Sequence, residues 1–423
     1  SEELKSEIRM PKSESSPTPK IRKRPGDDVR ADFGLAGTSP GDRGGAAPQH
    51  RRRSRCVRPT WPHLRICASA QGGASLTWLG VFPNGETSEA WGVSADGQTV
   101  VGAAYTSGIT RAFRWTASTG LVDLGGFGGN LHFAQGVSAD GSVVVGYSRD
   151  ASGNFRPFRW ADGTLAALPM LSGARWGRAL GVSADGDTVV GEFGLGAGRR
   201  RAFRWSSSGG TQDLGILPGG QEWSAAAAVS ADGNVVVGSA QIGNTYRAFR
   251  WTPETGMQNI DTLNGAFSQA HAVSADGATI VGQWQTPGSN RLEVFRWRAG
   301  IGMESLEVLP GGTWTDAFGV SADGRIIVGQ AQTANGDTVA VRWREGVGWE
   351  DLNTVYGELL TPETVLLSAT AISPDGRYIV GFGYNALTDR GEAYLLDTIP
   401  EPSALLALLS GCALLCRSLR RRV

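Results

Sequence analysis

Cysteine is scarce in this sequence and is confined to its two ends. The chain of 423 residues has four cysteines, at Cys56, Cys67, Cys412 and Cys416. The long central part therefore has neither a disulfide framework nor a cysteine pair suited to zinc. We expect its stability to come from packing and hydrogen bonds.

Lysine is absent beyond Lys23, and charge is unevenly distributed although the chain has no net charge. Residues 1–70 carry 15 basic and 8 acidic side chains (+7), residues 71–398 carry 21 and 31 (−10), and residues 399–423 carry 4 and 1 (+3). An acidic central part argues against nucleic acid as the main partner, because phosphate binding uses a basic surface.

Sustained hydrophobic periodicity is missing from residues 1–72, which are rich in Ser, Pro, Gly and Arg. This composition predicts a disordered basic leader. Ala68-Ser69-Ala70 is similar to the end of a signal peptide, but the apolar run of about 7–15 residues that should precede it is missing.

Internal repetition dominates the chain from residue 73 onward. The phrase V-S-A-D-G-x-x-V-V-G occurs seven times with variation, and a second phrase, A-F-R-W at its clearest, follows each copy. The aspartates of the first phrase are Asp96, Asp140, Asp185, Asp232, Asp276, Asp323 and Asp375, at spacings of 44, 45, 47, 44, 47 and 52.

Each repeat contains four short strand signals separated by turn signals, in the first repeat at 88–95, 99–105, 111–117 and 121–125. The Asp-Gly pair between the first two strands is a strong hairpin signal. Four strands per repeat, seven times, predict an all-β, seven-bladed β-propeller of four-stranded blades over residues 73–398.

Two details favour a closed ring over an open array. Alanine stands six residues before each repeated aspartate, and Gly or Ala stands two residues after that alanine, so one face of the first strand is small. The last repeat lacks a fourth strand, and residues 76–80 match the missing phrase. We expect this N-terminal strand to join the last blade and close the ring.

The last segment, residues 399–423, has Pro400, Glu401 and Pro402 before 14 uncharged residues, 403–416. As a helix this run is about 21 Å long, short for a bilayer core of roughly 30 Å. We expect a C-terminal apolar helix with a basic flank on the cytoplasmic side. The flank consists of Arg417, Arg420, Arg421 and Arg422.

This order of elements resembles the PEP-CTERM sorting signal of Gram-negative bacteria that produce exopolysaccharide. The resemblance implies export, retention in the inner membrane as a precursor, and processing by an exosortase near Pro400-Glu401-Pro402. The mature protein would then lie at the cell surface or in the extracellular matrix.

The repeats resemble those of the HAF-repeat extracellular proteins, which share the paired G-V-S-x-D-G…V-V-G and A-F-x-W phrases, over about 320 residues. Asp351-Leu352-Asn353 with Leu367-Ser368-Ala369-Thr370 is similar to that family's terminal repeat. The family's His is replaced here, for example by Arg111 before Ala112-Phe113. The resemblance implies location and fold rather than a particular chemistry.

The segment that leads into each blade carries the candidate binding residues. Nine residues before the aspartate, four consecutive blades have large aromatic residues, and the expected propeller places them on one rim. Aromatic rings suit sugar rings and also dominate protein interfaces. The alternative is that each ring fills the space between two blades. The four residues are Trp176, Trp223, Phe267 and Trp314.

Other patterns favour structure over chemistry. Each Asp-Gly turn offers a single carboxylate, whereas calcium needs several converging oxygens, so we expect structural turns and no metal site. The arginines of the A-F-R-W phrases are expected to pair or stack between blades.

The sequence offers few candidate catalytic residues. Residues 73–398 contain only two histidines, His132, expected in a loop, and His271, expected on a first strand, so no Ser/His/Asp set is evident. Glu192, Glu222 and the run Arg199-Arg200-Arg201 break the repeat without forming a recognisable constellation.

The sequence thus predicts an exported, transiently membrane-anchored propeller without cofactor or enzymatic activity. It would bind a component of the extracellular polysaccharide matrix or of the cell surface, with exosortase as its processing partner and no nucleic acid. The alternatives are a polysaccharide-acting lyase or glycosidase, and a structural surface protein without a specific ligand.

Overall fold

The computed structural model describes residues 73–288 and 291–398. The predicted leader, the predicted apolar helix, Pro400-Glu401-Pro402 and the terminal arginines lie outside these ranges. Within them, secondary structure is almost entirely strand, and no helix has the length and apolar character needed to cross a membrane.

The strands of the described residues fall into seven groups of four, numbered here as sheets 1 to 7 in chain order. Sheet 1 comprises β2 (Thr87–Val93), β3 (Val100–Thr106), β4 (Ile109–Thr116) and β5 (Gly120–Asp123). Sheet 2 comprises β6 (Gly128–Val137), β7 (Val143–Asp150), β8 (Phe155–Ala161) and β9 (Thr164–Ala167). Sheet 3 comprises β10 (Trp176–Val182), β11 (Thr188–Gly196), β12 (Arg199–Ser206) and β13 (Gly210–Asp213).

The remaining sheets follow the same order. Sheet 4 comprises β14 (Ser224–Val229), β15 (Val236–Ile242), β16 (Thr245–Thr252) and β17 (Gly256–Asn259). Sheet 5 comprises β18 (Ser268–Val273), β19 (Thr279–Gln285), β20 (Leu292–Arg298) and β21 (Gly302–Ser305). Sheet 6 comprises β22 (Thr315–Val320), β23 (Ile326–Gln332), β24 (Thr338–Arg344) and β25 (Gly348–Asp351). Sheet 7 comprises β26 (Val365–Ile372), β27 (Tyr378–Asn385), β28 (Arg390–Asp397) and β1 (Ser75–Gly80).

Neighbouring strands within each sheet are antiparallel, and the four strands expected in the first repeat lie within two residues of their predicted bounds. β1 pairs with β28 from Ser75 opposite Asp397 to Gly80 opposite Ala393. The N-terminal strand therefore joins the last repeat, as the sequence predicts. A single parallel bridge between Thr110 and Leu131 connects sheets 1 and 2.

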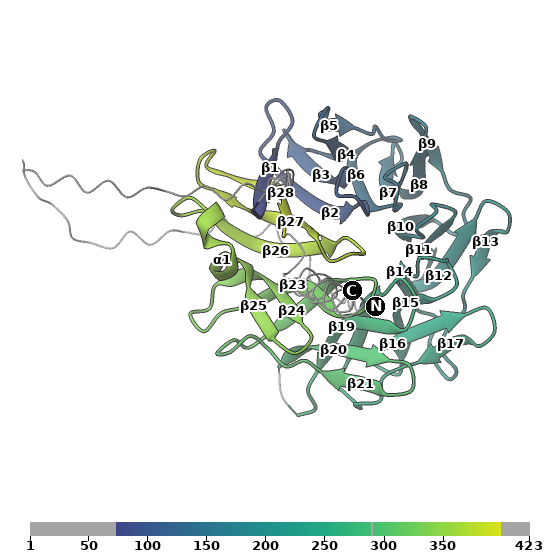
Figure 1. The fold of residues 1–423 in the computed structure, drawn as a ribbon. Helices are drawn as coiled ribbons and strands as arrows, with labels where there is room; N and C mark the ends of the chain where they lie inside the picture. Colours follow the sequence, from purple (N-terminus) through teal and green to yellow (C-terminus); the bar gives the residue numbers. More distant parts are fainter. Residues whose placement is uncertain (1–72, 289–290, 399–423) are drawn as a thin grey trace, which may run out of the picture. The chain divides into compact units, whose positions relative to one another are not determined.

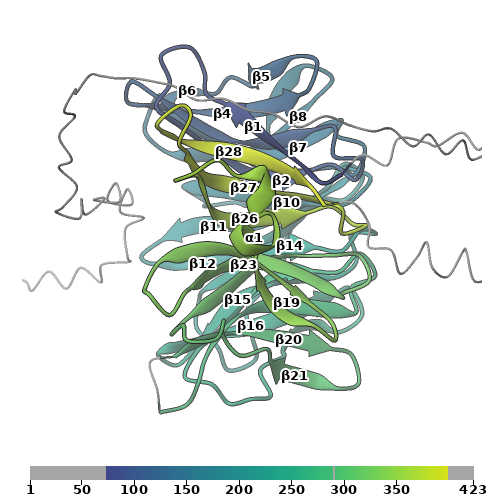
Figure 2. The same cartoon turned by 60° about the vertical axis from the view of Figure 1, so that its left-hand side comes forward.

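The sheets are arranged about a centre, with the first strand of each on the inside and the fourth on the outside (Figure 1). Each sheet contacts the next in chain order, and β2 of sheet 1 contacts β26, β27 and β28 of sheet 7. The view in Figure 2 shows the sheets following one another as twisted layers. This is the arrangement of a β-propeller.

The first two strands of each sheet leave no room for a large side chain at two repeated positions. The alanine six residues before each aspartate is at most 1% exposed in every sheet. A Cβ added to Gly238 would lie 2.0 Å from the carbonyl oxygen of Ala225. The glycines that end the V-V-G phrase show the same approach, at 1.8–2.0 Å. They are Gly102, Gly146, Gly191, Gly238, Gly282, Gly329 and Gly381.

The Ser-x-Asp-Gly turn after each first strand is a closed hydrogen-bonded unit, as sheet 2 illustrates. The Ser138 hydroxyl donates to Asp140 Oδ1 at 2.6 Å and accepts from the Val143 amide at 2.9 Å. The Ser142 amide and hydroxyl donate to the same carboxylate oxygen, and Gly141 has φ of 73°. The carboxylate is thus satisfied by its own turn, in agreement with a structural role.

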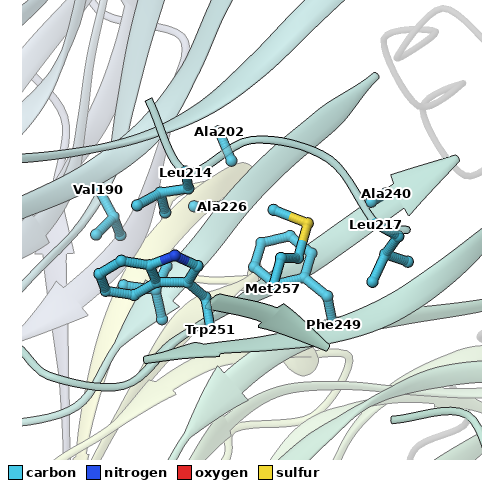
Figure 3. Packing of buried hydrophobic residues seen from close by; sticks show 10 residues of the cluster. Val190, Ala202, Leu214, Leu217, Ala226, Ala240, Phe249, Trp251 and Met257 are labelled. Atoms are coloured by element: carbon cyan, nitrogen blue, oxygen red, sulfur yellow. The ribbon is translucent and has the colours of Figure 1, made fainter. Parts of the chain in front are cut away.

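Large apolar side chains fill the space between successive sheets. Between sheets 3 and 4, Val190 and Leu214 pack with Phe249, Trp251 and Met257 (Figure 3). Full burial of a side chain such as Phe249 contributes about 1.5–3 kcal/mol. The core therefore consists of layers between the sheets.

The long connection before the last repeat is folded against sheets 6 and 7. Helix α1 (Leu352–Val355) and a 3-10 helix η1 (Gly357–Leu359) follow β25. The Asn353 side chain accepts from the Leu366 amide at 2.7 Å and donates to the Leu366 carbonyl at 2.9 Å. These bonds tie the connection to the strand that follows it.

The close approach at Gly238 predicts a large loss of stability in Gly238→Ala, of at least about 3 kcal/mol, because backbone atoms must move. Gly357→Ala is the control, since an added Cβ there meets no atom within 4 Å. Chemical denaturation measures both variants, and equal stabilities would contradict the packing argument.

The turn at Asp140 predicts an acid-dependent loss of stability. Donation by the Ser138 hydroxyl and by Ser142 lowers the pKa of Asp140 to about 2 from its ordinary value of 3.8. The stabilisation is therefore present above about pH 4 and is lost as the pH falls through 2. Asp140→Asn should flatten the dependence of unfolding free energy on pH between 4 and 2, with Ser142→Ala intermediate. Slopes equal to that of the unaltered protein would disprove this linkage.

Candidate functional site

One face of the described fold carries the connections that lead from the fourth strand of each sheet into the first strand of the next. Because neighbouring strands are antiparallel, the turns between second and third strands lie on the same face. We call it the connection face. The four predicted aromatic residues lie here, since Trp176 begins β10 and the others stand one residue before β14, β18 and β22. All four are half-buried.

The backbone at this position joins adjacent sheets. Trp223 forms a parallel bridge with Arg200 of the preceding sheet, and Trp314 forms one with Leu292. Leu131 occupies the same position in sheet 2 and bridges to Thr110. The position therefore has a structural role whichever side chain it carries.

Arg200 brings two of the predicted aromatic residues together. Its guanidinium carbon lies 5.1 Å from the ring centroid of Trp176 and 5.6 Å from that of Trp223. The Trp223 ring also meets the ring of Tyr246 edge-on, with centroids 4.6 Å apart. Contacts of guanidinium and aromatic rings at these distances are attractive and orient the arginine.

Arg178 extends the same arrangement into sheet 2. Its guanidinium carbon lies 4.9 Å from the ring centroid of Phe155, 5.1 Å from Tyr147 and 5.4 Å from Trp176. Alternating rings and guanidinium groups thus cross sheets 2, 3 and 4. We call this set the arginine–aromatic ladder, and its members are Tyr147, Phe155, Arg178, Trp176, Arg200, Trp223 and Tyr246.

Glu192 lies beneath the two ladder arginines. It is 4% exposed, and its carboxylate lies 2.9 Å from the guanidinium of Arg200 and 3.6 Å from that of Arg178. The register of β10 and β11 places Arg178 directly opposite Glu192. A buried carboxylate requires such partners, because its desolvation is costly.

Contacts within the protein occupy much of the Trp176 ring. A Cβ added to Gly194 would lie 2.1 Å from ring atoms of Trp176, so the ring packs against this glycine. Solvent instead reaches the arginines, whose side chains are 35% exposed at Arg178 and 22% exposed at Arg200. The ladder therefore offers a ligand N–H donors held in place by rings.

Phe267 and Trp314 are not part of the ladder. Among the described residues they take no part in ring or guanidinium contacts, and their carbonyl groups accept from the amides of Gln285 and Gln332. The structure thus brings together two of the four predicted aromatic residues and leaves the other two at separate sheet junctions.

Sequence reasoning missed Arg178, Tyr147 and Phe155, and it saw no constellation around Glu192 and Arg200. The available signal was the departure of Glu192 and of Arg199-Arg200-Arg201 from the repeat. What it lacked was the partner for each departure. Arg178 belongs to the same repeat as Glu192 but to another strand, and Tyr147 belongs to another repeat.

The first strands of all seven sheets line an axial pocket of about 260 Å³. His271 lies in it, with Nδ1 3.1 Å from Asp316 and 2.9 Å from the Ala317 carbonyl. Burial opposes protonation of His271, but these two acceptors together raise its pKa above the ordinary value.

His132 corrects an expectation, since it lies in β6 and not in a loop. Its Nδ1 is 2.8 Å from the Ser148 hydroxyl, and burial lowers its pKa. The described residues contain no group of three His, Cys, Asp or Glu suited to a metal ion.

Arginines of the A-F-R-W phrases contact the next sheet, as expected. Arg114, Arg159 and Arg204 each donate from Nε to the carbonyl oxygen of the glycine in the following sheet's Asp-Gly turn, at 3.3, 3.2 and 3.0 Å. These arginines are therefore structural.

The ion pairs of Glu192 predict that Glu192→Gln lowers the unfolding free energy by about 1–3 kcal/mol, because two guanidinium groups lose their counter-charge. The exposed Glu254→Gln is the matched control. Denaturation followed by tryptophan fluorescence measures both, and an unchanged stability of Glu192→Gln would refute the role given to this carboxylate.

Comparisons with known proteins show the fold. No family model and no curated protein matches the sequence. An oligogalacturonate lyase from Vibrio parahaemolyticus is similar in structure, with 11% identity, a TM-score of 0.52, and coverage of 77% of this chain and 94% of the lyase. The β-propeller domain of the Trilobed protease from Pyrococcus furiosus has 8% identity, a TM-score of 0.51, and coverage of 78% and 99%. At these identities the likeness extends to the β-propeller fold alone.

Proposed function

We propose that the seven sheets form a closed seven-bladed β-propeller with β1 completing the last blade. The contacts between sheets 7 and 1 repeat those between sheets 3 and 4. The Ser224 hydroxyl accepts from the Ala202 amide and donates to the Gly215 carbonyl. The Ser88 hydroxyl likewise accepts from the Ala393 amide of β28 and donates to the Gly80 carbonyl at the end of β1.

We propose further that this propeller binds a component of the extracellular polysaccharide matrix or of the cell surface, without making or breaking bonds. The arginine–aromatic ladder is the observation that carries this proposal. It spans three sheets on the connection face and combines oriented guanidinium donors with half-buried rings. An extended polymer rich in oxygen acceptors suits a row of donors better than a compact ligand does.

Export and transient membrane anchoring belong to the same proposal. They rest on the similarity of Pro400-Glu401-Pro402, the apolar run and the terminal arginines to a PEP-CTERM signal, with an exosortase as the processing enzyme.

The enzymatic alternative is a polysaccharide lyase or glycosidase. Shortening of the polymer during incubation would identify it.

The proposal predicts that Trp176→Ala/Trp223→Ala weakens binding to extracellular polysaccharide purified from the producing organism. Without both rings, the guanidinium of Arg200 is no longer held in one orientation and its N–H donors are less well placed. We therefore expect a loss of at least about tenfold in affinity. Co-sedimentation with the polysaccharide measures this with the full chain.

Trp314→Ala is the matched control, because Trp314 occupies the same repeat position and bridges sheets in the same way but lies outside the ladder. Thermal melting of each variant separates lost binding from lost folding. Equal weakening by both changes would contradict a site at the ladder, and absence of binding by the unaltered chain would contradict the proposed function.

A further inference from the structure

Basic residues gather on the connection face of sheet 3, although residues 71–398 as a whole carry a net charge of −10. Five arginines lie around the ladder there, against three carboxylates, giving a local excess of two positive charges. The arginines are Arg175, Arg178, Arg199, Arg200 and Arg201, and the carboxylates are Glu192, Asp213 and Glu222.

These arginines divide into two groups. Ion pairs within the cluster engage Arg178 and Arg200 with Glu192, and Arg201 with Asp213 and Glu222. Among the described residues, Arg175 and Arg199 stand outside these pairs, and both are exposed. The excess positive charge therefore lies at the solvent-facing side of the cluster.

Arg175 and Arg199 flank the same end of one hairpin. Gly196 of β11 is opposite Arg199 of β12, and a Cβ added to Gly196 would lie 3.1 Å from the guanidinium carbon of Arg175. Gly196 thus lies against the guanidinium of Arg175 and opposite the backbone of Arg199, which directly precedes the ladder arginine Arg200 in β12.

We infer that this cluster selects polysaccharides whose sugars carry carboxylates, and that Arg175 and Arg199 are the residues that bind the carboxylate groups. A guanidinium group donates two parallel hydrogen bonds to a carboxylate. Arg178 and Arg200, which share the counter-charge of Glu192 and are held by rings, supply donors to the hydroxyl groups of the same chain. This inference rests on the proposed function, because it names the chemical class of the ligand at the same site.

The experiment compares binding of the full chain to polygalacturonate and to its methyl ester, which share a backbone and differ in charge. We expect tighter binding of the acid form by at least about tenfold, and a loss of about tenfold for that form in Arg175→Gln/Arg199→Gln. Binding of the acid form should also weaken as salt is raised from 0.05 to about 0.5 M.

Arg390→Gln is the matched control. Arg390 is exposed and begins β28, four residues before Tyr394, as Arg199 begins β12 four residues before Phe203. The comparison is needed because residues 1–70 carry a charge of +7, and attraction of a polyanion to that charge would be the same in both variants. Only a difference between the two variants supports the inference.

The outcomes separate this inference from the proposed function. Equal binding of acid and ester, with unaltered binding by Arg175→Gln/Arg199→Gln and weakened binding by Trp176→Ala/Trp223→Ala, overturns carboxylate selection and leaves polysaccharide binding in place. Double-stranded DNA that binds as tightly as polygalacturonate, and through the same two arginines, also overturns it. If the unaltered chain binds neither polymer nor the native polysaccharide, the proposed function fails as well.

Discussion

The close approach of the first two strands in every sheet is the constraint on which the rest of the structure depends. At the V-V-G glycine an added Cβ would lie within 2.0 Å of a carbonyl oxygen, and the neighbouring alanine is buried in all seven sheets. Large side chains are excluded from these positions and pack instead between sheets farther from the centre. At Leu131, Trp223 and Trp314, the residue that leads into the first strand forms a backbone bridge with the third strand of the preceding sheet.

The junction between a first strand and the preceding sheet explains how a structural position acquires a second role. The residue nine before the aspartate bridges adjacent sheets whether it is Leu131 or Trp314, so its backbone serves the fold. At Trp176 and Trp223 the side chains add contacts to Arg200, and Arg178 extends the row. Departures from the repeat accumulate in sheet 3, and they are mutually dependent because the buried Glu192 needs both arginines. Loss of Glu192 alone would leave two guanidinium groups without their shared counter-charge.

The repeats carried enough information to predict the strands, the pairing of β1 with the last repeat, and the location of the aromatic residues. They did not reveal the ladder, because most of its contacts join side chains from different strands, some of them in different repeats, and depend on how each side chain is oriented. The misplacement of His132 has a different cause. Residues 128–130 are Gly-Gly-Asn, which reads as a loop, whereas pairing of Gly128 with Asp150 makes them part of β6. Tertiary pairing outweighs local preference there.

The boundary between sheets 7 and 1 lacks one hydrogen bond that sheets 1 to 4 make to the next sheet. In sheets 1 to 4 the amide of the alanine in the Ser-Ala-Asp-Gly turn donates to the equivalent carbonyl of the next sheet, as from Ala95 to Ala139. Pro374 holds this position in sheet 7, where it accepts from Ala322 but has no amide to donate onward. The Tyr378 ring covers Gly97 of sheet 1, as the residue three after the aspartate covers the next turn glycine at the other boundaries, for example Thr99 at Gly141. Ser88 bonds Gly80 and Ala393 in the way that Ser224 bonds Gly215 and Ala202. The contacts between sheets 7 and 1 involve no residue of sheets 2, 3 and 4, so the pairing of β1 with the last repeat and the arginine–aromatic ladder are physically separate. We therefore expect changes in the ladder to leave this boundary intact.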